Sequence, residues 1–124
     1  MKIAEVSKQF DISADTLRYY ERVGLMTPVR RTSSGIRDYS EQDCARIQFI
    51  KCMRGAGMSI EALIEYMRLI AEGDSTIQQR IALLEEQRDL MRQRVAEMQA
   101  GIDKLDYKIA NYAQVMKTAE EKLR

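Results

Sequence analysis

The chain contains no histidine, no tryptophan, one proline and only two cysteines among its 124 residues. A site for a soft metal ion needs three or four soft ligands, and without histidine only two thiols are on offer. The sequence also lacks a glycine-rich phosphate loop and a pair of acids placed for general acid–base chemistry. We therefore expect no metal, no cofactor and no enzyme active site.

Long apolar runs are missing as well. No segment approaches the roughly 20 apolar residues that a membrane span needs, and Met1–Glu5 lacks the apolar region of a signal peptide. We expect a cytoplasmic protein with no membrane partner, in which Cys44 and Cys52 are free thiols. Eight residues apart on one predicted helix, the two thiols are too distant to form a disulfide with each other.

Charge of one sign does not dominate, since the formal net charge is +1. Residues 1–56 hold ten Lys or Arg and seven Asp or Glu, which gives +3, whereas residues 57–124 hold ten and twelve, which gives −2. The segment 28–37 carries three arginines and no acid: Arg30, Arg31 and Arg37. Three arginines are also typical of an ordinary solvated loop, so charge alone does not predict that this segment binds nucleic acid.

The first forty residues carry the signals of two short helices and a hairpin. Helices are predicted over residues 3–10 and 14–23, with Ser13 as the N-cap of the second and Gly24 at its end. Two short helices joined by three or four residues predict a helix-turn-helix. Beyond Pro28, residues 29–31 and 36–39 flank a polar loop with Gly35 and predict a small hairpin, a wing.

Three further helices are predicted. Ser40 caps a helix over 41–54 that ends at Gly55 and Gly57, Ser59 caps one over 60–71 that ends at Gly73, and Asp74 caps a last helix from residue 75 almost to the end. The last helix carries two apolar series of seven-residue period that interleave at 4-3 spacing, the seam of a coiled coil. The series are Ile77, Leu84, Met91, Met98, Leu105 and Tyr112, and Ile81, Arg88, Val95, Ile102, Ile109 and Met116.

A helix of this length needs a partner. It would reach roughly 60 Å, which a domain of about 70 residues cannot cover. The simplest partner is the same helix of a second copy, and a helical hairpin turning near Gly101 is the alternative. We predict a mostly α fold, with a winged helix-turn-helix domain over residues 1–72 followed by a coiled-coil dimerisation helix over residues 73–124.

The second predicted helix offers one polar face, formed by Asp15, Arg18, Tyr19 and Arg22 at i, i+3, i+4 and i+7. Arginine can bond guanine through two hydrogen bonds or hold a phosphate, and a tyrosine hydroxyl can bond a phosphate oxygen. An ordinary solvated helix face has the same composition. The predicted wing, its basic loop and a dimerising helix together favour DNA recognition.

Several strings of the sequence resemble one family. Ile3-Ala4-Glu5-Val6, Ser13 to Leu25 with its Thr-Leu-Arg-Tyr-Tyr-Glu run, Gly35 to Ser40 with its Arg-x-Tyr wing, and Ile47 to Ile60 together resemble the MerR family of transcription regulators. The resemblance covers residues 1 to about 72, and the long helix fits the same layout. Lys2 departs from the hydroxyl cap of many relatives, which puts the cap of the first helix in doubt.

The resemblance implies specific roles. Members typically form a homodimer through an antiparallel coiled coil, bind double-stranded promoter DNA with an overlong spacer, and activate transcription by RNA polymerase through distortion of that DNA. Deformation costs a few kcal/mol, which protein–DNA contacts can offset. The resemblance places DNA contacts on six residues: Thr16, Arg18, Tyr19, Tyr20, Arg37 and Tyr39.

The resemblance also suggests a signal. Lys51-Cys52-Met53-Arg54 is similar to the cysteine context of a short subgroup that senses aldehydes, other electrophiles or nitrosative stress, so Cys52 is the predicted sensing thiol. Lys51 and Arg54 could stabilise its thiolate. A helical wheel, however, places Cys52 on an apolar face with Ala45, Phe49 and Ala56 and makes Cys44 the more exposed thiol. The alternative is therefore that Cys52 is a small core residue.

A coiled-coil scaffold without a small-molecule signal is the alternative function. In that case the long helix would be the main interaction surface, and the N-terminal helices would bind another protein. Phosphate contacts make DNA affinity fall as salt rises, so salt-dependent binding to a promoter duplex separates the two hypotheses.

Overall fold

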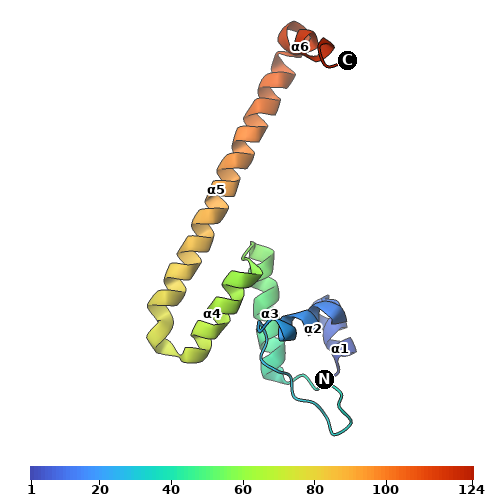
Figure 1. Cartoon of the computed structure of the whole chain (residues 1–124), viewed down its shortest axis with the longest axis vertical. Coiled ribbons are helices and arrows are strands. Elements are labelled where there is room, and N and C mark those ends of the chain that lie inside the picture. Colours follow the sequence, from blue (N-terminus) through green and yellow to red (C-terminus); the bar gives the residue numbers. More distant parts are fainter. The chain divides into compact units, whose positions relative to one another are not determined.

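The computed structural model describes all 124 residues, mostly as helices, with short connections except for a long loop over residues 23–40 (Figure 1). It divides into two compact units, Met1–Gln87 and Arg88–Arg124, with the boundary inside the longest helix. The functional boundary expected after residue 72 stays a prediction. The elements are α1 (Ile3–Phe10), α2 (Ala14–Arg22), α3 (Glu41–Ala56), α4 (Ile60–Glu72), a 3₁₀ turn η1 (Asp74–Thr76), α5 (Ile77–Ala110), a π-helical turn η2 (Tyr112–Met116) and α6 (Lys117–Glu121).

The first unit has a small apolar core built from α1 to α4 and the loop between α2 and α3. Removing these side chains from water is the main force that holds the four helices together. Helix α3 supplies the centre, since it packs on both α1 and α4. The side chains that are most completely buried are Val6, Leu17, Leu25, Ile47, Ile50 and Leu63.

Serine residues begin three of these helices, as the sequence predicts. The hydroxyls of Ser13, Ser40 and Ser59 each accept a hydrogen bond from the backbone N–H three residues on, at 3.1 Å in every case. Asp43 completes a capping box by accepting the Ser40 N–H at 2.9 Å. Lys2 makes no side-chain cap at α1, so the doubt raised by its departure from a hydroxyl is confirmed.

Helix α2 ends in a turn that requires glycine. Gly24 has a φ of +84°, its N–H donates to the carbonyl of Glu21, and the N–H of Leu25 donates to the carbonyl of Tyr20. This pair of bonds is a Schellman motif. It turns the chain so that Leu25 enters the core directly after the helix. Gly55, by contrast, does not help to end α3, which continues to Ala56 and stops at Gly57 with a φ of +106°.

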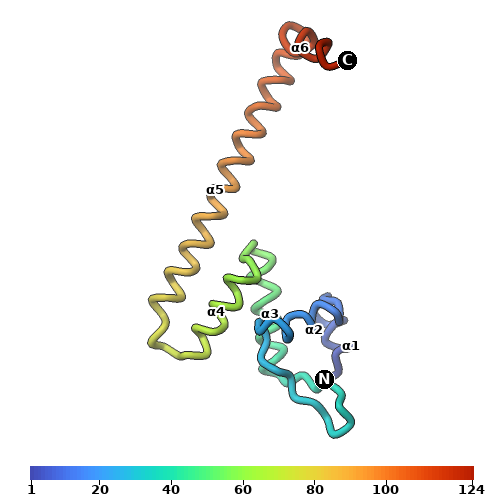
Figure 2. Tube along the Cα trace, viewed as in Figure 1, coloured from blue at the N-terminus to red at the C-terminus, as the bar shows by residue number.

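The predicted wing forms, but with less regular structure than a two-stranded hairpin. Only one antiparallel bridge exists, between Arg31 and Arg37, and no residue is in a strand. The N–H of Thr32 donates to the carbonyl of Ile36 at 2.7 Å, and Gly35 has the predicted positive φ. A second cross-loop bond runs from the N–H of Asp38 to the carbonyl of Arg30 at 2.7 Å. The predicted hairpin is therefore wrong in extent, because the backbone pairing covers only residues 30–32 and 36–38 and forms no strand. Figure 2 shows this open loop between α2 and α3.

The last helix is shorter than predicted. Asp74 lies in a separate 3₁₀ turn and its side chain caps nothing, and α5 ends at Ala110 rather than near the C-terminus. At this point the side-chain amide of Asn111 donates to the carbonyl of Tyr107 at 2.9 Å and competes with the helical pattern. Helix α6 then folds back, and Glu120 accepts bonds from Lys108 and the Tyr112 hydroxyl at 2.7 and 2.6 Å.

Candidate nucleic-acid interface

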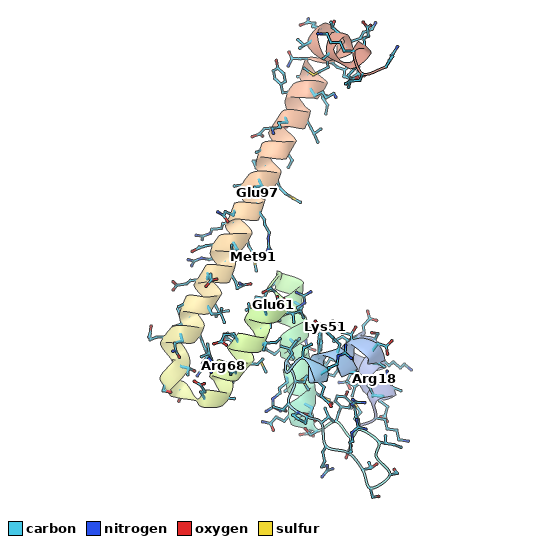
Figure 3. All side chains as sticks on the ribbon, in the orientation of Figure 1. Arg18, Lys51, Glu61, Arg68, Met91 and Glu97 are labelled. Carbon is cyan, nitrogen blue, oxygen red and sulfur yellow. The ribbon has the colours of Figure 1, made fainter.

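Helix α2 presents the polar face that the sequence predicts. Arg18, labelled in Figure 3, and Tyr19 are exposed and Thr16 is half-buried, while Leu17 is buried in the core. The helix is anchored from below by apolar side chains, so its outer face is held rigidly. Rigid presentation of a few polar side chains is what reading base edges in a major groove requires.

The long side chains of this face are arranged before any DNA arrives. The Arg18 guanidinium bonds the Asp15 carboxylate at 2.9 Å, and the Arg22 guanidinium lies 5.3 Å from the centre of the Tyr19 ring. The first is an exposed ion pair that contributes little to stability and can be exchanged for a phosphate or a base. The second is a cation–π contact that limits the conformations of both side chains.

Arg37 ties the wing to α2. Its Nε atom lies 3.1 Å from the Glu21 carboxylate, and the two side chains are only 20% and 18% exposed. The wing and the recognition helix are therefore joined by a shielded ion pair. Of the two arginines predicted to meet DNA, Arg37 is the one whose ion pair is shielded from water, whereas the pair of Arg18 with Asp15 is exposed.

Tyr20 and Tyr39 are buried, unlike the other predicted DNA contacts. The Tyr39 ring is 4% exposed, and its hydroxyl has no hydrogen-bond partner in the chain. Burial raises the pKa of the Tyr39 phenol, so the group is neutral near pH 7. Both rings contribute to the core beneath the α2 face, and their contact with DNA stays a prediction. An unpartnered hydroxyl at this depth is a donor still available to an acceptor that reaches it.

Asp38 joins the wing to the N-terminus, a role that the sequence did not predict. Asp38 accepts bonds from the Met1 amine and from Arg30, each at 2.8 Å. These two cations lower the pKa of the Asp38 carboxyl, the amine having the larger effect. Arg31 bonds the carbonyl of Gly35 at 2.7 Å and stiffens the loop tip. The lone acid that directly follows the basic segment was the signal that could have identified this role.

The two thiols are placed opposite to the helical-wheel expectation. Cys52 is exposed and Cys44 is half-buried, so the interpretation of Cys44 as the more exposed thiol is wrong, and so is that of Cys52 as a core residue. The wheel followed the apolar run Ala45, Phe49, Cys52 and Ala56. The fold instead buries Ile47 and Ile50, because that face of α3 meets α1 and α4.

The cations beside Cys52 are engaged elsewhere. The Lys51 ammonium bonds the carbonyl of Phe10 at 2.5 Å, and Arg54 bonds the carbonyl of Met58 at 2.7 Å. The expectation that they stabilise a Cys52 thiolate finds no support in these contacts. At Cys44, burial raises the pKa of the thiol, and the nearby acids Asp43 and Glu41 add to this effect. Of the two thiols, Cys52 is the more accessible to a reagent in solution.

We also searched the structure for a metal site and for a membrane-spanning helix. No three histidine, cysteine, aspartate or glutamate side chains gather closely enough to hold a metal ion. None of the helices combines the length and apolar character that crossing a membrane requires.

Comparison with known sequences gives a consistent result. The model of the MerR HTH family regulatory protein matches residues 1–70, and the model described as MerR, DNA binding matches residues 44–108. The HTH-type transcriptional regulator AdhR of Bacillus subtilis is 61% identical over 88 residues. That alignment covers 71% of this chain and 63% of AdhR, which is less than two thirds of that relative's length.

Solved structures match over nearly the whole chain. A MerR family transcriptional regulator from Listeria monocytogenes is 45% identical with a TM-score of 0.75, covering 99% of this chain and 93% of that one. HiNmlR, a MerR family regulator described as lacking the sensor domain and bound to promoter DNA, is 30% identical with a TM-score of 0.68. Its match covers 94% of this chain and 92% of HiNmlR. The helix-turn-helix, the wing and these matches agree: the chain belongs to the MerR family and is a DNA-binding transcription regulator of the MerR type.

Proposed function

We propose that this chain binds promoter DNA as a homodimer and activates transcription by RNA polymerase through distortion of the promoter. The observation that carries the proposal is the exposed face of α2. Arg18 and Tyr19 are exposed on this face, whereas Leu17 and Tyr20 on the opposite face are buried in the core. In this proposal Arg18 and Tyr19 meet DNA directly and Thr16 lies at the edge of the contact. The DNA in the HiNmlR structure supports the same use of the fold in a relative.

The wing serves as a second contact with the DNA backbone. Arg30 has a side chain that is 83% exposed, and its only partner is Asp38, which it can leave for a phosphate at small cost. Arg37, held by Glu21, fixes the angle between wing and helix, and Tyr39 supports it from the core. The six residues expected at the interface thus divide into those that reach DNA and those that position them.

The homodimer is proposed from the apolar side chains of α5. Val95, Met98 and Ile109 are 68%, 74% and 74% exposed, far more than apolar side chains of a folded helix in a finished assembly. Two copies of the helix would cover each other's seam, and two recognition helices would then address two half-sites. RNA polymerase enters the proposal as the enzyme that uses the distorted promoter.

The signal is proposed to be an electrophile, such as an aldehyde, that modifies Cys52. The thiol is exposed and lies one turn beyond Phe49, whose ring stacks on Tyr66 of α4 at a centroid distance of 5.6 Å. An adduct at Cys52 would grow beside this stack and disturb the packing of α3 on α4. Such a disturbance can shift the balance between two shapes of the dimer.

The test is a gel-shift titration with the promoter duplex nearest the chain's own gene. We expect binding that exceeds binding to a scrambled duplex and that weakens steeply as salt rises, because phosphate contacts release counterions. A scaffold protein would give the same weak signal with both duplexes. That result would favour the coiled-coil interaction function and reject the regulator.

A further inference from the structure

The turn between α4 and α5 is closed by a buried threonine. Thr76 is only 3% exposed, although it lies in the short 3₁₀ turn η1. Its hydroxyl lies 2.6 Å from the carbonyl oxygen of Leu69 and 2.8 Å from that of Gly73, so its proton is held between two carbonyl groups at the end of α4. Figure 2 shows the chain reversing here, between α4 and the start of α5. The hydroxyl therefore ties this turn to the helix before it.

Arg80, in the first turn of α5, holds the same turn from the other side. Its Nε atom donates a hydrogen bond to the Thr76 hydroxyl at 3.0 Å, and its Nη2 atom donates to the carbonyl of Gly73 at 2.7 Å. The last carbonyl groups of a helix have no partner within that helix, so side chains or water must satisfy them. Here Thr76 and Arg80 satisfy them together, and we call these two side chains and Gly73 the α4–α5 joint.

Gly73 gives the backbone of the joint a conformation that other residues rarely adopt. Its φ is +96° and its ψ is −166°, a region that is populated essentially by glycine. A Cβ atom at this position would meet no heavy atom within 4 Å, so the requirement for glycine comes from the backbone and not from crowding. Gly73 therefore sets the direction in which the chain leaves α4, and Thr76 and Arg80 hold it.

A second contact attaches α5 to α4 farther along. The backbone N–H of Ser59, the residue that caps the start of α4, donates to the side-chain carbonyl of Gln87 at 3.3 Å. Gln87 follows Thr76 by eleven positions, roughly 16 Å along the helix axis. The start of α5 is thus attached at both ends of α4. Two points of attachment define a direction, whereas one would let α5 swing.

Side-chain packing leaves room between the two helices. A cavity of about 310 Å³ lies between α4 and the start of α5, and Leu69, Ala82 and Leu83 are among the residues that line it. Leu69 is buried, but Leu83 is only half-buried and Ala82 is exposed. Helices whose side chains interdigitate fully have their crossing angle set by that packing. Since α4 and α5 do not, the hydrogen bonds of the joint and of Gln87 have to set it.

A small tilt at the joint is large on the scale of DNA. Helix α5 is continuous from Ile77 to Ala110. A residue 20 positions beyond the joint lies about 30 Å along the axis, so a tilt of about 10° displaces it by about 5 Å. One base pair shifts a half-site by about 3.4 Å and rotates it by about 35° around the DNA axis. A loose joint would therefore let the two α2 helices of a homodimer meet half-sites at several spacings.

We infer that Thr76 and Arg80 are positioning residues that determine which distance between two half-sites the regulator accepts. The inference rests on the proposed binding of promoter DNA by a homodimer and adds the residues that make this binding selective for spacing. Neither residue has to contact DNA. Both act by holding α5 against α4, so that the helices which recognise DNA are presented at one separation.

The first test uses promoter duplexes that differ only in the number of base pairs between the half-sites. In gel-shift titrations we expect the unmodified chain to bind the native spacing about 100-fold more tightly than a spacing changed by two base pairs. Thr76→Val removes the hydroxyl but keeps the branched side chain, and should reduce this preference to about tenfold or less. Arg80→Gln should act in the same direction. Thr76→Ser keeps the hydroxyl and should keep the preference.

Ile47→Val is the matched control, because it weakens the buried core of the same unit and leaves the joint intact. It should keep the preference of the unmodified chain. An undiminished preference in Thr76→Val would overturn the inference, and so would an equal loss in Ile47→Val, since the loss would then follow stability. An unmodified chain that binds the promoter no better than a scrambled duplex would instead reject the proposed function.

The second test measures the joint without DNA. Gln48→Cys on α3 and Glu85→Cys on α5, both exposed positions, carry nitroxide labels for a dipolar distance measurement in a background with Cys44→Ser and Cys52→Ser. An excess of unlabelled chain restricts the signal to distances within one chain. We expect a narrow distance distribution that broadens when Thr76→Val is added. Distributions of equal width would overturn the inference while leaving the promoter-binding regulator intact.

Discussion

The guanidinium of Arg37 and the carboxylate of Glu21 lie 3.1 Å apart and join the wing to the recognition helix. Both side chains are mostly shielded from water. The pair spans 16 residues of sequence and connects the two segments that we propose to contact DNA. The proposed DNA-binding surface is therefore assembled in the free chain.

Replacing Glu21 by glutamine should loosen that connection. The Arg37 charge would remain without its partner, and we expect the free energy of unfolding to fall by about 1–2 kcal/mol, between the values for exposed and fully buried pairs. Urea unfolding followed by circular dichroism measures the change. Glu65→Gln removes an exposed pair with Arg68 and should leave the midpoint nearly unchanged. Equal midpoints for both variants and the unmodified chain would show that the Arg37 pair is not structural.

Replacing Arg18 by alanine should weaken promoter binding by about 1–3 kcal/mol without affecting folding, since the side chain is exposed. Asp15→Ala is the matched control, because it removes the same ion pair but keeps the arginine. That control should bind as tightly as the unmodified chain or more tightly. Should both variants lose affinity equally in a gel-shift titration, the ion pair rather than the arginine would be what matters.

Placing aspartate at Ile102 and Ile109 should dissociate the proposed dimer. Each change puts an unpaired charge into the seam, at a cost of several kcal/mol if the seam is covered. Promoter binding should fail with it, because two half-sites are no longer held by one assembly. Light scattering gives the mass, and Lys104→Asp on the outer side of α5 serves as the control. A dimer that survives the double change would place the contact between copies elsewhere.

Replacing Cys52 by serine should abolish induction by electrophiles while promoter binding stays normal. Cys52 is the exposed thiol, whereas burial raises the pKa of Cys44 and keeps it protonated near pH 7. Cys44→Ser should therefore respond like the unmodified chain in a reporter assay with an added aldehyde. Loss of induction in Cys44→Ser alone would move the sensing role to that residue, and full induction in the doubly substituted chain would exclude both thiols.

The anchoring of the wing by Asp38 should depend on pH. The Met1 amine and Arg30 lower the pKa of this carboxyl, so its contribution is present above the ordinary carboxyl range, near pH 4, and is lost as pH falls through the lowered pKa. Asp38→Asn removes that contribution. The difference in urea midpoint between the two chains should therefore shrink as the solution is acidified below about pH 4. A difference that stays constant down to strongly acidic pH would mean that the carboxylate charge is not involved.

Local signals predicted most of the fold. Ser13, Ser40 and Ser59 mark their helix starts because a capping hydroxyl acts within three residues. Gly24 marks a helix end because its positive φ is a property of one residue. The same local character explains why the polar face of α2 was found from spacing alone.

The failures involve contacts between distant segments. The end of α5 at Ala110 depends on Asn111 and on Glu120, which returns from α6 to bond Lys108. The exposure of Cys52 depends on which face of α3 meets α1 and α4, and a helical wheel of one helix cannot rank two weakly apolar faces. Asp38 was missed for the same reason, since its partner Met1 is 37 residues away.

The most direct test of a promoter-binding dimeric regulator is a footprint of the full chain on the promoter nearest its own gene. We expect two protected half-sites related by a dyad, about one turn of DNA or a multiple of it apart, with enhanced cleavage between them where the DNA is distorted. Treatment with an aldehyde should change the enhanced cleavage while the half-sites stay protected. A single protected site, or protection that a scrambled duplex shows equally, would contradict the proposed function.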